Sequence, residues 1–331
     1  MLPVAELHLH IEGTLEPELM TRLARRNGLS LPDLSDAELA ARYDFADLQG
    51  FLDVYYDSVA VLRTEEDFYD LATAYLRRAS AAGVRRAEIF FDPQTHLGNG
   101  VPFEVVINGL SSALTDARSS LDLSADLIMC FLRDLGGEAA METLRTALPY
   151  REHFIGIGLD SAEVGYPPSL FKDVYALAAA EGLHRVAHAG EEGGPDYVWD
   201  ALDNLGVERI DHGNRALEDP NLVARLRDER IPLTVCPLSN VSLKSVATLA
   251  EHPLPAMLDA GLFVTINSDD PAYFGGYVDD NFTAIQKTFN LTPTQLTQLA
   301  QNSFEAAFIT PEDRTRWTNE IQTTVAARET E

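Results

Sequence analysis

Two histidines near the N-terminus have the spacing of metal ligands. His8 and His10 lie in the stretch V-A-E-L-H-L-H-I at positions 4–11, whose apolar content predicts a β-strand. Side chains two residues apart project from the same side of a strand, so both imidazoles face one way and the apolar residues beside them face the core. A lone His-x-His pair also arises by chance, so it predicts only half of a metal site.

Three further polar clusters each follow a hydrophobic run: H-A-G-E at 188–191, D-H-G at 211–213 and S-D-D-P at 268–271. Together with the first pair they offer three neutral nitrogens and one anionic oxygen, a donor set that suits one zinc ion, with iron as the competitor. A bound divalent cation lowers the pKa of its water toward about 7 and supplies hydroxide. The predicted ligands are His8, His10, His188 and Asp269.

The same clusters carry groups that can move protons. Glu191 lies just beyond its strand, where a carboxyl can exchange protons with a substrate. His212 is placed to hold or deprotonate the metal-bound water, and Asp270 to accept a hydrogen bond from a ring N–H of the substrate. The residue types leave simpler readings open: a solvated loop acid, a core histidine and, for Asp269, a turn residue before proline.

Eight apolar runs alternate with helical patterns, which predicts a parallel sheet because parallel strands need helical crossovers. Eight such units favour closure into a (β/α)8 TIM-type barrel forming a single domain over 1–331, with an open doubly wound sheet as the alternative. In a barrel the carboxyl ends of the strands meet on one face, so the polar clusters would share one mouth. The predicted strands are 4–11, 86–91, 125–132, 154–159, 185–189, 208–211, 231–236 and 262–266.

Two helical additions to the barrel are also predicted. A helical insertion at 12–83 follows strand one and is expected near the mouth. Thr-Pro pairs that begin at Thr292 and Thr310 predict an N-cap followed by proline at the first helical position, so two helices should fill 292–331. The helices expected in the insertion are 17–26, 36–43, 51–62 and 65–81.

Composition narrows the class of partner. The formal net charge of −27 argues against nucleic acid and acidic membranes, which need a basic surface. No apolar stretch approaches the length of a membrane span, and no signal peptide is recognised. Cys130 and Cys236 lie in apolar runs and are expected to be free thiols in a reducing compartment. A cytoplasmic protein with a small-molecule substrate is predicted.

The motifs together resemble the adenosine/adenine deaminase family of the amidohydrolase superfamily. They are H-L-H-I-E-G at 8–13, H-A-G-E at 188–191, R-I-D-H-G at 209–213, C-P-L-S-N at 236–240 and N-S-D-D-P-A-Y-F-G-G-Y at 267–277, in the family's order. The resemblance implies one zinc ion in a (β/α)8 barrel and hydrolysis of an exocyclic amine on a purine to a carbonyl, with release of ammonia. Lys172 lies in the helix after strand four, away from where binuclear relatives carry a bridging lysine, so one metal is expected.

The resemblance also implies a role for each site residue. Glu191 matches the acid that protonates the ring nitrogen beside the attacked carbon, and His212 matches the residue that orients and deprotonates the water. Asp270 matches the carboxylate that contacts the imidazole half of the purine. The residues that match the metal ligands are His8, His10, His188 and Asp269.

Two departures favour the adenine branch of this family, which takes the free base. Glu12 stands where the adenosine branch has Asp. Glu163 stands at the position where that branch tends to have a glycine whose backbone meets the purine. We expect both side chains to bind substrate by closing the ribose space, with Glu163 accepting a purine N–H. The predicted reaction is adenine to hypoxanthine, as in purine salvage. Alternatives are adenosine, another six-substituted purine, or an inactive deaminase-fold binding protein.

Overall fold

The computed structural model describes residues 2–30 and 44–329. Its eight strands are all parallel, and each pairs with the next in sequence, so the predicted barrel is confirmed and the open sheet is excluded. The strands are β1 (Val4–Glu6), β2 (Val84–Phe91), β3 (Ser124–Leu132), β4 (Gly156–Asp160), β5 (His184–Ala189), β6 (Arg209–His212), β7 (Pro232–Val235) and β8 (Phe263–Ile266).

The segment after β1 closes the ring but is not a regular strand to position 11 as predicted. Leu7 donates its backbone N–H to the side-chain oxygen of Asn267 (2.8 Å), so a side chain replaces the expected ladder partner. Beyond that point the chain joins β8 through two backbone bonds, from Asp269 to His8 (3.1 Å) and from His10 to Asp269 (3.0 Å). The two histidines are therefore fixed by main-chain contacts at the seam of the barrel.

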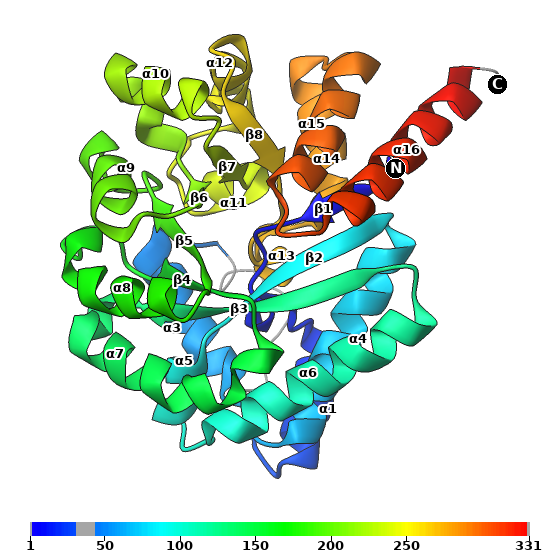
Figure 1. Ribbon diagram of the computed structural model, residues 1–331. Helices are drawn as coiled ribbons and strands as arrows, with labels where there is room; N and C mark the ends of the chain where they lie inside the picture. Colours follow the sequence, from blue (N-terminus) through cyan, green and yellow to red (C-terminus); the bar gives the residue numbers. More distant parts are fainter. Residues whose placement is uncertain (1, 31–43, 330–331) are drawn as a thin grey trace.

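Helices surround the strands, and α16 lies at the edge of the molecule near the N-terminus (Figure 1). The predicted helix 36–43 lies outside the described residues. The α-helices are α1 (Pro17–Arg26), α3 (Leu48–Val59), α4 (Glu65–Ala81), α5 (Pro93–Gly98), α6 (Phe103–Ser120), α7 (Gly136–Ala147), α8 (Lys172–Ala180), α9 (Pro195–Asp200), α10 (Pro220–Asp228), α11 (Pro237–Ser242), α12 (Leu254–Asp259), α13 (Pro271–Phe274), α14 (Val278–Phe289), α15 (Pro293–Ala306) and α16 (Pro311–Glu329).

Short helical turns complete the connections, and the predicted cap at Thr292 is present. Its hydroxyl accepts from the backbone N–H of Gln295, whose side chain accepts from the Thr292 N–H in return, so α15 starts with a capping box. The short turns are η1 (Glu12–Thr14), η2 (Arg133–Leu135), η3 (Leu148–His153), η4 (Pro168–Phe171), η5 (Ala201–Leu205), η6 (Asn214–Glu218) and η7 (Leu249–Glu251).

A buried ion-pair network fills the amino end of the barrel. Arg209 lies 2.6 Å from Glu88, which also contacts Arg86 at 3.1 Å. All these side chains are buried, and their partners satisfy the charges. The cavity is consequently confined to the opposite, carboxyl end of the strands. Among the described residues, none of the helices combines the length and apolar character needed to cross a bilayer.

Candidate metal centre and active site

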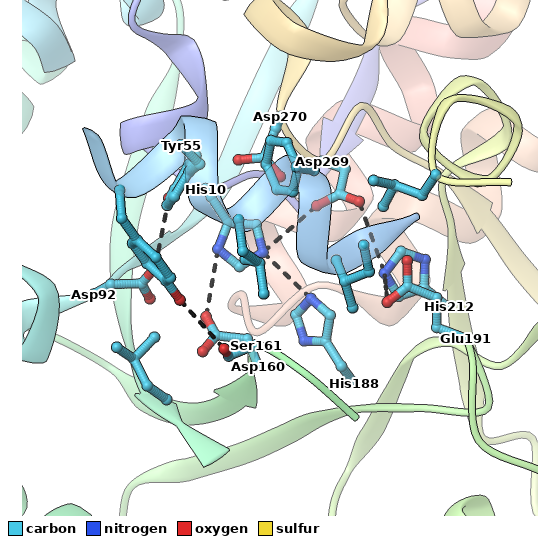
Figure 2. Close-up of a pocket in the computed structure, with 16 residues that line it drawn as sticks. His10, Tyr55, Asp92, Asp160, Ser161, His188, Glu191, His212, Asp269 and Asp270 are labelled. Atoms are coloured by element: carbon cyan, nitrogen blue, oxygen red, sulfur yellow. Dashed lines mark hydrogen bonds and ion pairs between the residues drawn. The ribbon is translucent and has the colours of Figure 1, made fainter. Parts of the chain in front are cut away.

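Three of the predicted ligands, His10, His188 and Asp269, converge in the cavity (Figure 2), and His8 lies against Asp269. The imidazole Nε2 atoms of His10 and His188 lie 3.2 Å apart, and Asp269 Oδ1 is 3.3 Å from His8 Nε2 and 3.5 Å from His10 Nε2. Zinc–ligand bonds of about 2.0–2.1 Å place tetrahedral ligand atoms about 3.3–3.4 Å apart. The spacing therefore fits ligand atoms that share one zinc ion. A second grouping adds His212 to His8, His188 and Asp269, with all donor atoms within 4.8 Å.

The partners of His8 leave its Nε2 free to bind a metal. The Thr234 hydroxyl donates its one proton to Asp211 (2.7 Å), so it must accept from the Nδ1–H of His8 (2.9 Å). His8 Nε2 is then an unprotonated, buried nitrogen with no hydrogen-bond donor among the described residues. An orphaned lone pair that faces an anionic oxygen is costly without a cation, so the donor set fits a divalent metal.

Two more ligands are oriented from behind. His10 Nδ1 lies 3.5 Å from Asp160 Oδ2. This contact directs the Nε2 atom of His10 toward the other predicted ligands. Ser239 donates its hydroxyl to Asp269 Oδ2 (2.6 Å) and leaves Oδ1 facing the histidines. Outer partners of this kind fix ligand orientation before a metal arrives.

Burial keeps His10 and His188 neutral, as metal ligands must be. It lowers the pKa of His10 to about 4 and the pKa of His188 well below the ordinary value, and neighbouring histidines add to the effect on His188. His8 differs: although burial opposes it, the carboxylates of Asp269 and Asp211 raise the pKa of His8, and the charge of His8 in turn holds the pKa of Asp269 well below its usual range. A divalent cation would take the place of the His8 proton and meet three neutral nitrogens and one anionic oxygen.

Three side chains of the site stand on strained backbone. Ser161, His212 and Asp269 have φ of 69°, 67° and 67°, in the left-handed region that residues with a Cβ rarely adopt. Ser161 immediately follows β4, His212 ends β6, and Asp269 lies three residues after the end of β8. Strain of this kind persists where the surrounding structure holds a side chain in a needed direction.

Glu191 and His212 lie on the same side of the metal-ligand cluster. His212 Nε2 is 3.5 Å from Glu191 Oε2 and 3.7 Å from Asp269 Oδ2. Burial, together with the charges of Asp269 and Glu163, raises the pKa of Glu191 well above its ordinary value. This shift in pKa favours the protonated acid, which can donate its proton to a bound molecule.

A hydrogen-bond relay fixes the tautomer of His212. The backbone N–H of Leu254 donates to His252 Nδ1 (3.0 Å), so a neutral His252 carries its proton on Nε2 and donates it to Asn240 Oδ1 (3.1 Å). The Asn240 amide then donates from Nδ2 to His212 Nδ1 (3.2 Å). His212 consequently holds its own proton on Nε2, facing the site. This orientation makes His212 a hydrogen-bond donor to water, not a metal ligand.

Helix α3 covers the mouth of the cavity, as expected for the insertion after strand one. The cavity encloses about 420 Å³ including its opening, and flat or branched apolar side chains form much of its wall. The predicted site residues that line it are His10, His188, Glu191, His212, Asp269 and Asp270. The other lining residues are Leu48, Phe51, Leu52, Tyr55, Tyr56, Asp92, Leu132, Asp160, Ser161 and Leu243.

The structure places Glu12 behind the cavity, not in it. Its Oε1 accepts from the backbone N–H of Asp92 (3.1 Å) and lies 2.8 Å from His96 Nε2. The side chain is fully buried and is absent from the cavity wall. The expected direct contact between Glu12 and a substrate is therefore corrected: its carboxylate holds the segment that carries Asp92.

Glu163 is likewise corrected, because its carboxylate is occupied by the chain itself. It accepts four backbone N–H groups, from residues 190–193, at 2.7 to 3.1 Å. The residue after β4 that lines the cavity is Ser161, not Glu163. The Glu163 side chain reaches the loop after β5 and anchors the turn that carries Glu191.

Glu163→Gln is expected to lower the free energy of unfolding by about 2–4 kcal/mol, because its NH₂ would face backbone N–H donors. Urea denaturation measures the change. Glu192→Gln is the control: this side chain is half-buried on the same loop, and its variant should stay within about 0.5 kcal/mol of the parent protein. Equal stability of both variants would show that the loop does not depend on the carboxylate.

Sequence reasoning missed two acids of the wall, Asp92 and Asp160. Burial and the neighbouring carboxyl groups raise the pKa of Asp92 well above its ordinary value, and burial raises the pKa of Asp160 to about 7. Asp160 ends a barrel strand and Asp92 directly follows one, and this position alone could have indicated that they lie at the mouth of the barrel. Nothing in their neighbouring residue types distinguishes them from strand-end caps.

Comparison with known proteins agrees with this geometry. A relative from Streptomyces coelicolor named adenine deaminase is 61% identical over 97% of this chain and 95% of its own length. The crystal structure of an adenine deaminase from Arthrobacter aurescens superposes with a TM-score of 0.97 at 52% identity, covering 98% of this chain and 100% of that one. A Burkholderia ambifaria amidohydrolase solved with bound Zn gives a TM-score of 0.90 at 28% identity, covering 100% and 93%.

A family model described as adenosine deaminase matches residues 3–324. That span takes in all eight strands and every residue of the cavity wall. The chain therefore belongs to the adenosine deaminase family, as its fold and its metal-binding motifs indicate independently.

Proposed function

We propose that the protein hydrolyses adenine to hypoxanthine and ammonia with one zinc ion, and that it acts in the cytoplasm. The observation that carries the proposal is the buried Glu191, with its raised pKa, beside a zinc-type donor set at a cavity with flat apolar walls. The relatives named adenine deaminase support the choice of the free base.

The residues divide the reaction between them. Zinc held by His8, His10, His188 and Asp269 would supply hydroxide at neutral pH by lowering the pKa of water. Glu191 transfers its proton to the ring nitrogen N1, which makes the neighbouring C6 electrophilic. His212 donates its Nε2–H to the attacking oxygen and so orients it. Water adds at C6, the C6–N bond breaks, and the amine leaves as ammonia after gaining protons.

The cavity wall favours a planar base. Phe51 and Tyr55 pack with their ring centroids 5.2 Å apart, and Leu132 and Leu243 complete the apolar surface. Aromatic and branched side chains of this kind suit stacking on a purine. Asp270 stands at the seam end of the cavity, where by family resemblance it would meet the imidazole half of the purine.

Catalytic efficiency on adenine is expected to exceed that on adenosine by at least about 100-fold, because the chain is similar to relatives named adenine deaminase and side chains of α3 cover its cavity. Ultraviolet absorbance follows the loss of the amine, with N6-methyladenine as a third substrate. Metal analysis should give one zinc per chain. A higher efficiency on adenosine would overturn the free-base assignment, and two tightly bound ions would overturn the mononuclear site.

A further inference from the structure

Two buried carboxyl groups lie side by side in the cavity, across His10 from Glu191 (Figure 2). Asp92 follows β2 and Asp160 ends β4, and each is 3% exposed. Their oxygens and His10 Nδ1 lie within 4.8 Å of one another. In the proposed mechanism neither carboxyl group contacts the substrate, and Asp160 serves only to orient His10, although burial of such groups is costly when they have no partner.

Acceptor oxygens of this pair are left open toward the cavity. Apart from a proton that the two carboxyl groups can share and the nearby Cys130 thiol, no donor among the described residues reaches Asp92 Oδ1 or Asp160 Oδ1. The remaining Asp92 oxygen lies 3.5 Å from the Tyr55 hydroxyl, and Asp160 Oδ2 lies 3.5 Å from His10 Nδ1. An N–H group on a bound ligand would satisfy the open oxygens. The open oxygens therefore indicate a ligand that donates a hydrogen bond here.

The pair is held rigidly from behind and closed at its rim. Glu12 fixes the backbone of Asp92 by accepting its N–H (3.1 Å). At the rim, Tyr56 from α3 and Ser161 from the loop after β4 join their hydroxyls at 3.2 Å. Ser161 keeps a left-handed backbone, with φ of 69°, to make this contact. A substituent that a bound ring carried toward this rim would have to break the contact between the Tyr56 and Ser161 hydroxyls.

The fused rings of a purine connect this edge to the reacting edge. A base whose N1 meets Glu191 places its imidazole ring on the far side of the cavity, toward Asp92 and Asp160 (Figure 2). A free base has an N–H in that ring, and a nucleoside has none because the sugar replaces the proton. We propose that Asp92 and Asp160 accept the N9–H of the free base and thereby exclude N9-substituted purines. This inference rests on the proposed function.

The test compares adenine with 9-methyladenine, which keeps the reacting edge and lacks the N–H. In the wild-type enzyme, kcat/KM for 9-methyladenine should be at least about 1,000-fold lower, as expected when a buried polar group loses its partner. Asp92→Asn should lower kcat/KM for adenine by about 10–100-fold and leave 9-methyladenine nearly unchanged. Inhibition constants of purine and 9-methylpurine give the same comparison where turnover is too slow to measure.

Asp160→Asn is the second variant, and it should narrow the ratio of kcat/KM for adenine to that for 9-methyladenine. Because Asp160 also contacts His10, its kcat/KM values are compared per bound zinc. Asp134→Asn is the matched control, because Asp134 follows β3 but is exposed and outside the cavity wall. Equal turnover of the two substrates by the wild-type enzyme would overturn the inference, as would equal losses on both substrates in both variants. Absence of any adenine turnover by the wild-type enzyme would instead overturn the proposed function.

Discussion

Glu191→Gln is expected to lower kcat for adenine by at least about 1,000-fold while the zinc content stays unchanged. The amide has the shape of the carboxyl group but has no proton to give to N1. Burial raises the pKa of Glu191 well above its ordinary value, so the parent enzyme holds the proton at neutral pH. The variant removes that proton and leaves the ligands His10, His188 and Asp269 in place.

The pH profile separates proton donation from a merely structural loss. An acid with a raised pKa is active below that pKa, and activity falls as the pH rises through it. The parent enzyme should therefore lose activity at alkaline pH, and this limb should vanish from the residual activity of Glu191→Gln. Glu192→Gln serves as the neighbouring control. Full activity of Glu191→Gln with bound zinc would remove Glu191 from the mechanism.

Strand ends could be predicted because two physical rules act locally. Apolar runs mark barrel strands, and polar residues after them meet on one face, which placed His8, His188 and Asp269 near one another. The structure confirms the predicted barrel, and the donor atoms of these residues lie close together in it. The early end of β1 was not predictable, because the partner that interrupts its ladder is the side chain of Asn267, distant in sequence.

Buried acids show where sequence reasoning stops. Glu12, Glu163, Asp92 and Asp160 are all carboxyl groups at strand ends, and residue type alone makes each a candidate for binding substrate. Their hydrogen bonds divide them. Glu163 accepts four backbone N–H groups, and Glu12 accepts one backbone N–H away from the cavity, whereas the other two carboxyl groups lie on the cavity wall. Which carboxyl group is satisfied depends on loop geometry that has no periodic signature.

Asn240→Asp is expected to lower kcat by about 100-fold or more near pH 8, although the change is isosteric and Asn240 touches no substrate. An aspartate offers two acceptors and no donor. It would accept from His252 and also from His212 Nδ1, so a neutral His212 would lose the proton on Nε2 that faces the attacking oxygen. Asn240→Ala imposes no tautomer and should cost less, about 10-fold.

The two variants should also differ in their dependence on pH. In the parent enzyme, burial and the nearby histidines lower the pKa of His212 to about 3, so it is neutral throughout the working range. A carboxylate beside Nδ1 raises an imidazole pKa, so lowering the pH protonates His212 in Asn240→Asp and returns the Nε2–H. Activity of this variant should therefore rise as the pH falls, and ¹⁵N chemical shifts of the ring would report the tautomer. If the aspartate variant matched the parent at pH 8, His212 would act without a fixed Nε2 proton, as a base.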